Sequence, residues 1–125
     1  MLLSLRRRAE SKARIREHGM ATTRIQIPAT IKRGDVAEVR LLIRHPMETG
    51  FRHDNVGRPI PQNVIKLVTC RYNGEEIFRA ELFSGVAANP YLAFFTTVSE
   101  SGTLEVTWSD ETEQTETERI QVTVV

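Results

Sequence analysis

The fold is decided by residues 64–82, which read VIKLVTCRYNGEEIFRAEL. Two runs rich in apolar and β-branched residues flank Asn73-Gly74, a dipeptide that tolerates the two positive φ angles of a type I′ turn. The sequence therefore predicts a tight β-hairpin with strands at 64–72 and 75–82.

The turn also predicts the register of this hairpin. With Tyr72 opposite Glu75, Arg71 faces Glu76, Cys70 faces Ile77, and the pairing continues in step to Ile65 opposite Leu82. One face then carries a core set: Ile65, Leu67, Phe78, Ala80 and Leu82. The other face carries Val68, Cys70, Tyr72 and Ile77. Because this second face is too apolar for water, we expect either the rest of the chain or a partner to cover it. Cys70 then lies outside the main core, provided that no bulge interrupts the strands.

The region around the hairpin has the same strand character from Thr22 onward, since apolar and polar residues mostly alternate. Further strands are expected at 24–27, 36–44, 91–98, 103–108 and 116–125, with turns at 32–35 and 99–102. The core candidates are Val39, Leu41, Ile43, Leu104, Val106, Trp108, Ile120, Val122 and Val124. Seven strands in about 100 residues predict an all-β sandwich.

Length and charge indicate one domain with a basic extension. The chain has 125 residues and a net charge of +1, which gives no reason to expect a nucleic-acid partner. Residues 1–19 hold six basic and two acidic residues, a net charge of +4, and the remainder carries −3. We expect residues 20–125 to form the domain and translation to start at Met20. The chain has no run of about 18 apolar residues to span a membrane and no apolar segment after its arginines to act as an export signal.

The long connection at residues 45–63 holds three of the five prolines and two of the three histidines. Connections of this length are usually functional or disordered, and the prolines favour an ordered, functional loop. His45, Glu48, His53 and Asp54 are possible metal ligands, but their spacing matches no standard zinc or iron pattern. We therefore expect no metal and no cofactor here.

An enzyme remains a third hypothesis. The His-Pro pair is similar to that of superoxide reductases, which are immunoglobulin-like, but their iron needs four histidines and a cysteine. From residue 20 onward the chain offers only His45, His53 and Cys70. A cysteine on an apolar strand is more often an inert hydrophobe than a nucleophile. The acidic run is expected to be a solvated loop: Asp110, Glu111, Glu113, Glu116 and Glu118. We expect no catalytic residue.

Four motifs resemble, in this order, the SoxZ family of sulfur oxidation. They are residues 43–52 (IRHPMETGFR), 57–61 (GRPIP), 70–76 (CRYNGEE) and 88–91 (ANPY). The resemblance implies an immunoglobulin-like antiparallel sandwich that pairs with SoxY in the periplasm. SoxY carries the sulfur intermediates of thiosulfate oxidation on a C-terminal Gly-Gly-Cys-Gly-Gly arm and supplies the export signal for both subunits. Other Sox enzymes would contact the complex transiently. Residues 121–125 (QVTVV) contain no such arm.

The expected partner-binding residues come from three segments. They are His45, Pro46, Met47, Glu48, Gly50 and Arg52 in the long connection, Val68, Cys70, Tyr72 and Ile77 in the hairpin, and Asn89, Pro90 and Tyr91 in the last motif. The alternative to a SoxY partner is a binding domain of the same fold with an unrelated partner.

Overall fold

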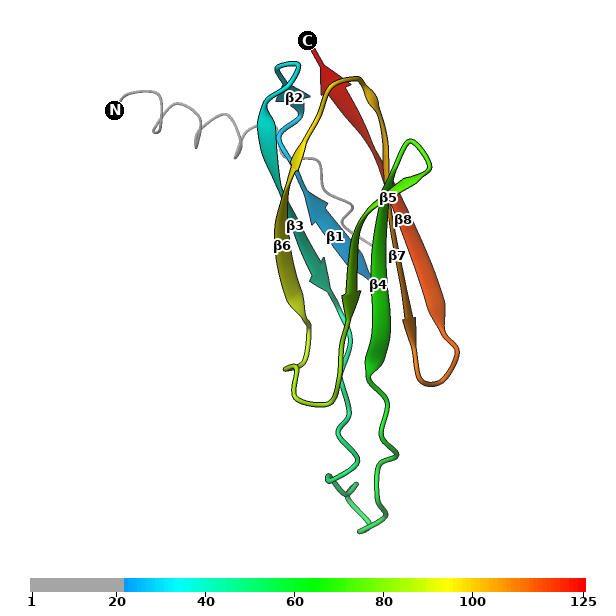
Figure 1. Cartoon of the computed structure of the whole chain (residues 1–125). Coiled ribbons are helices and arrows are strands. Elements are labelled where there is room, and N and C mark those ends of the chain that lie inside the picture. The colour runs from blue at the N-terminus through cyan, green and yellow to red at the C-terminus, as the bar shows by residue number, and fades with distance from the viewer. Residues whose placement is uncertain (1–21) are drawn as a thin grey trace, which may run out of the picture.

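The computed structural model describes residues 22–125, and the expectations for the basic extension and Met20 lie outside this range. The described chain forms eight strands in two sheets (Figure 1). The strands are β1 (Thr23–Gln26), β2 (Thr30–Ile31), β3 (Val36–Ile43), β4 (Ile65–Tyr72), β5 (Glu75–Glu81), β6 (Tyr91–Thr97), β7 (Gly102–Asp110) and β8 (Thr115–Val124). Within residues 22–125, no helix is long and apolar enough to cross a membrane.

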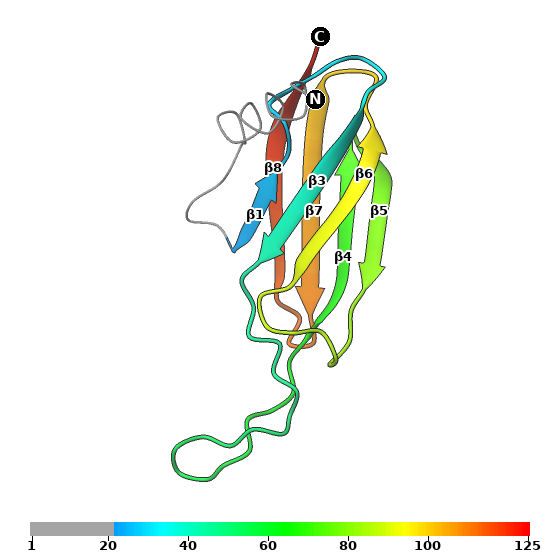
Figure 2. The ribbon, with the colours of Figure 1, turned by 90° about the vertical axis from the view of Figure 1, so that its left-hand side faces the viewer.

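The two sheets pack face to face as a sandwich, with strand orders β1-β3-β6 and β2-β8-β7-β4-β5 (Figure 2). The neighbouring strands are antiparallel except for β2 and β8, which are parallel. The predicted immunoglobulin-like sandwich is confirmed, and the seven predicted strands agree with the observed ones to within two residues. The eighth, β2, has only two residues and is too short to show alternation.

The core lies between the sheets and contains the expected apolar triplets of β3 and β7, whereas in the third triplet only Val122 is buried and Ile120 and Val124 are half-buried against the core. Val39, Leu41 and Ile43 of β3 are fully buried, as are Val106 and, almost completely, Trp108 of β7. The Trp108 indole Nε1 donates a hydrogen bond of 2.9 Å to Thr23 Oγ1 on β1, so the polar atom of the largest core side chain is satisfied across the two sheets.

The predicted turn is confirmed, but the predicted hairpin register is wrong beyond it. Asn73 and Gly74 have φ angles of 51° and 86°, and Arg71 lies opposite Glu76 as expected. A bulge follows, because Cys70 then pairs with Phe78 and leaves Ile77 as an extra residue in β5. A one-residue insertion of this kind moves every later side chain to the opposite face relative to its partner strand.

The bulge places Val68 and Cys70 in the core, where both are fully buried. Their assignment to an outer, partner-facing surface was therefore wrong, because the opposite sheet of the same chain covers them. Leu67 is only half-buried and lies outside the core cluster. A second irregularity, between Ile65 and Leu67 in their pairing with β7, keeps Ile65 inside.

Candidate functional site

The long connection forms an arm, residues 48–63, that projects from one end of the sandwich (Figures 1 and 2). At its base the backbones of Glu48 and Asn63 exchange two hydrogen bonds of 2.8 Å. Farther out, Ile60 N donates to Arg52 O over 2.9 Å. At the tip Asp54 Oδ1 accepts hydrogen bonds from the backbone amides of Val56 and Arg58. The arm is thus an irregular hairpin with its own hydrogen bonds.

The arm presents both apolar and charged groups to solvent. Phe51 is 84% exposed and Val56 is exposed near the tip. The Arg52 guanidinium hydrogen-bonds to Glu48, and this contact lowers the pKa of the Glu48 carboxyl despite the opposing effect of desolvation. An exposed apolar tip on an ordered arm is typical of a surface that contacts another protein.

The base of the arm is fixed by a buried histidine. His45 Nε2 lies 3.0 Å from Asp110 Oδ2, and the Met47 backbone amide donates to His45 Nδ1 over 2.9 Å. Because Nδ1 accepts this hydrogen bond, the ring proton lies on Nε2 and is donated to Asp110. The ring also meets Trp108 edge-on, with centroids 5.5 Å apart. With both nitrogens engaged and the side chain buried, the His45 imidazole has a structural role.

Asp110 is fully buried, so the expectation that it belongs to a solvated loop was wrong. Its other oxygen accepts hydrogen bonds from the Thr112 amide and hydroxyl and from the Gln114 amide. Burial alone would raise the pKa of Asp110, but the hydrogen bonds from His45, Thr112 and Gln114 outweigh it and lower the pKa to about 2. The ionised carboxylate therefore connects the β7–β8 turn to the start of the long connection.

Two of the sequence motifs meet at His45. Its backbone amide donates to Asn89 Oδ1 over 3.0 Å, and the Asn89 amide donates to His45 O over 2.8 Å. Asn89 has a φ of 53°, a left-handed conformation that asparagine tolerates better than most residues. The ANPY and IRHPM motifs thus form one unit at the arm end of the sandwich.

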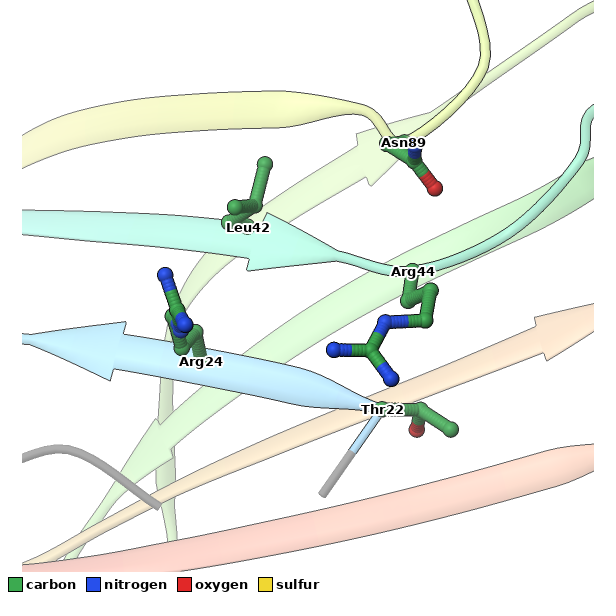
Figure 3. A pocket seen from close by; sticks show the side chains of 5 residues that line it. All are labelled: Thr22, Arg24, Leu42, Arg44 and Asn89. Carbon is green, nitrogen blue, oxygen red and sulfur yellow. The ribbon is translucent and has the colours of Figure 1, made fainter. Parts of the chain in front are cut away.

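A shallow pocket of about 150 Å³ lies beside this unit, on the outer side of the three-stranded sheet (Figure 3). Its walls are Thr22, Arg24, Leu42, Arg44 and Asn89. Arg24 of β1 lies opposite Leu42 of β3, and Arg44 follows the end of β3. Apart from Asn89, sequence reasoning missed these residues, because nothing in the local pattern relates residues 22 and 24 to residue 89.

The same outer side carries an apolar surface, which we call the β3–β6 face and define by Leu42, Tyr91, Ala93 and Phe95. Leu42 lies directly opposite Tyr91, and Ala93 and Phe95 follow on the same side of β6. Tyr91 is 58% and Phe95 69% exposed. Several neighbouring exposed apolar side chains on a sheet indicate an interaction surface.

The structure separates the predicted site residues into three groups. The buried ones are His45, Met47, Val68, Cys70 and Pro90, the half-buried ones are Glu48, Gly50, Tyr72 and Ile77, and the exposed ones are Pro46, Arg52, Asn89 and Tyr91. The arm and the last motif therefore supply the accessible candidates. In the hairpin Tyr72 donates its hydroxyl to Glu100 O over 2.6 Å, and Ile77 occupies the bulge.

The three residues of the enzyme hypothesis are not brought together. Cys70 lies opposite Val106, four positions along β7 from the Asp110 that binds His45, a separation of about 13 Å at the rise of a strand. His53 lies far out in the arm, bridged to Pro59. Within residues 22–125, no three His, Cys, Asp or Glu side chains are grouped so that they could hold a metal ion.

We expect the Cys70 thiol to be unreactive in the folded protein. It is fully buried, and burial raises its pKa to about 12, so very little reactive thiolate exists near neutral pH. Ellman's reagent at pH 8 should therefore label Cys70 only after unfolding in guanidinium chloride. Rapid release of one equivalent of thionitrobenzoate from the native protein would contradict this assignment.

Comparison with solved structures reveals the same fold in proteins of different activities. Superoxide reductase (neelaredoxin) from Ignicoccus hospitalis is 20% identical over 94% of this chain and 87% of its own, with a TM-score of 0.67. The sulfur carrier protein SoxY from Chlorobium limicola f. thiosulfatophilum is 9% identical over 100% of this chain and 99% of its own, with a TM-score of 0.60. At these identities the similarity establishes the fold alone.

Sequence comparison is more specific. No curated protein sequence matches the chain significantly. The model of the family described as sulphur oxidation protein SoxZ matches residues 25–121, which is most of the described domain and includes all four motifs. This chain therefore belongs to the SoxZ family of sulphur oxidation proteins.

Proposed function

We propose that the chain is the non-catalytic binding subunit of a sulfur-carrier heterodimer that works in thiosulfate oxidation. Its partner is a SoxY-type chain, the subunit that membership of the SoxZ family implies. The partner holds the sulfur intermediates covalently on the cysteine of a C-terminal Gly-Gly-Cys-Gly-Gly arm. This chain supplies the rigid body beside which that arm is presented to the enzymes that dock transiently.

The observation that carries this proposal is the position of Cys70. It is the only cysteine of the chain, and a covalent sulfur carrier needs an accessible thiolate. The Cys70 thiol is enclosed between the two sheets, with its pKa raised to about 12. The cysteine that carries sulfur therefore has to come from the other subunit.

The β3–β6 face is the proposed contact surface for that subunit. Its exposed aromatic side chains, Tyr91 and Phe95, are of the type that anchors protein interfaces. The arm extends from the same end of the sandwich as the start of β6 and adds Phe51 and Val56 as a second point of contact. The hydrogen bonds within the arm support a pre-organised surface, which lowers the entropic cost of binding.

The proposed location is the periplasm. A chain that folds with a partner before export would use the export signal of that partner, and the heterodimer would cross the membrane as one unit. Intact heterodimer in a periplasmic extract supports this route, whereas exclusive recovery of the chain from the cytoplasm contradicts it.

The carrier role predicts where sulfur is found. We expect intact mass spectrometry of the heterodimer, after incubation with thiosulfate and the remaining Sox enzymes, to give mass increases on the SoxY-type subunit only. The mass of this chain should stay unchanged because its thiol is inaccessible. A sulfur adduct on this chain under native conditions would refute the division of labour.

A further inference from the structure

We propose that the pocket lined by Thr22, Arg24, Leu42, Arg44 and Asn89 binds a small oxyanion of the sulfonate or sulfate type. The assignment of sulfur chemistry rests on the proposed function, whereas the preference for an oxyanion rests on the pocket itself.

The two arginines approach each other because of the sheet register. Arg24 pairs with Leu42, and the Arg44 amide donates to Thr22 O over 2.7 Å, so Arg24 and Arg44 are diagonal neighbours on adjacent chain segments. The Cα atoms of such diagonal neighbours lie about 7–8 Å apart. Both side chains line the same hollow (Figure 3). An oxyanion in this hollow receives charge-assisted hydrogen bonds from the Arg44 guanidinium.

The other polar groups of the pocket also suit an anion. Asn89 Oδ1 accepts the His45 amide, and the same side chain carries an NH₂ group that can donate. Thr22 adds a hydroxyl, and none of the five lining residues is acidic. The described lining therefore contains donor groups and no carboxylate, which favours an oxyanion over a cation.

Arg44 and Arg40 provide an internal comparison, since both lie on the outer side of the sheet: Arg40 within β3 and Arg44 directly after it. The Arg40 guanidinium is neutralised by Glu38 over 3.0 Å. The Arg44 guanidinium makes no ion pair with any residue in the range 22–125, although it lies over the sheet beside the pocket. This contrast indicates that Arg44 is placed for a group from outside the described domain.

Two sources of the oxyanion are consistent with this chemistry. Leu42 belongs both to the pocket and to the β3–β6 face, so a partner bound on that face lies beside the pocket. A sulfonate group on the cysteine of the partner's arm is the first source. Free sulfate or thiosulfate is the second.

The first experiment compares two forms of the SoxY-type partner, with its arm cysteine either carbamidomethylated or S-sulfonated. The dissociation constant with the carbamidomethylated partner, divided by that with the S-sulfonated partner, isolates the contribution of the anionic group. We expect a ratio of about ten for the wild-type chain, close to one for Arg44→Gln, and about ten for the matched control Arg40→Gln. A wild-type ratio of one, or an unchanged ratio in Arg44→Gln, excludes the arm-borne sulfonate.

The second experiment titrates sodium sulfate and sodium thiosulfate into the isolated full chain at constant ionic strength, with chloride as the reference salt. A saturable NMR shift of the Arg44 Nε–Hε signal, absent with chloride, identifies a free anion as the ligand. The proposal is overturned if neither experiment responds to Arg44. If no heterodimer forms with either partner, the proposed function fails, while this titration still decides whether the pocket binds an oxyanion.

Discussion

Replacing Asp110 by alanine should lower the free energy of unfolding by about 3 kcal/mol, the largest loss expected for any single change away from the apolar core. The substitution removes a buried carboxylate and leaves the His45 Nε2 proton and the amides of Thr112 and Gln114 without their acceptor. For a domain of about 100 residues this corresponds to a fall in Tm of about 12–24 °C. Chemical denaturation followed by circular dichroism measures the change directly.

Asp54→Ala is the matched control, since Asp54 also accepts two backbone amides but lies in the exposed arm. We expect a much smaller loss from that variant. A loss from Asp110→Ala no larger than the Asp54→Ala loss would show that the buried pair does not hold the arm end of the sandwich together.

Asp110 should also make the wild-type protein sensitive to acid. Its pKa of about 2 in the folded state lies below the ordinary value of 3.8. Its stabilising contribution is therefore present in full above pH 4 and is lost as the pH falls towards 2. This component of the acid sensitivity should be absent from Asp110→Ala. Equal acid sensitivity in both proteins would contradict the low pKa.

Phe95→Asp should weaken binding of the SoxY-type partner by about 100-fold or more, the second large effect that we expect. Truncation of an aromatic anchor at an interface centre commonly costs this much, and a buried carboxylate without a partner adds to the loss. Because Phe95 is 69% exposed in this chain, the fold and its Tm should change little. Isothermal titration calorimetry against the purified partner measures the effect.

Phe83→Asp is the control for this change. Phe83 is an equally exposed phenylalanine, 67% accessible, but it lies in the loop after β5 and not on the β3–β6 face. Full affinity in Phe83→Asp with a large loss in Phe95→Asp supports the proposed face. Full affinity in Phe95→Asp would move the interface elsewhere on the molecule.

Local sequence patterns were sufficient to predict the architecture. Alternation placed seven strands, and Asn73-Gly74 predicted a turn whose two positive φ angles the structure contains. The core triplets followed from the same alternation, because a strand with one buried face repeats every two residues. The exception was β2, whose two residues are too few to show any period.

The hairpin register could not be predicted, because the bulge adds one residue to β5 and no feature of the local sequence distinguishes a bulged strand from a regular one. Ile77 is as suitable for a regular strand as for a bulge. One signal did exist: the face with Val68 and Cys70 was too apolar to be exposed. Its cover is the opposite sheet of the same chain, so the apolarity of the face indicated the core and not a partner.

The candidate site depended on contacts between distant segments. His45 and Asp110 are separated by 65 positions, and His45 and Asn89 by 44. Nothing local distinguishes Asp110 from the acidic residues that follow it, of which Glu111 and Glu113 are exposed near the same turn. The motifs marked the right region, but only the fold separates its buried supports, such as His45, from its accessible surface, such as Tyr91.

The central claim is that this chain binds a SoxY-type subunit and leaves the covalent chemistry to it. The most direct measurement mixes the two purified subunits, encoded by the same genome, and determines the stoichiometry and affinity by sedimentation velocity and calorimetry. We expect one saturable one-to-one complex with a dissociation constant on the order of nanomolar. Two independent monomers at micromolar concentrations of both subunits would contradict the account.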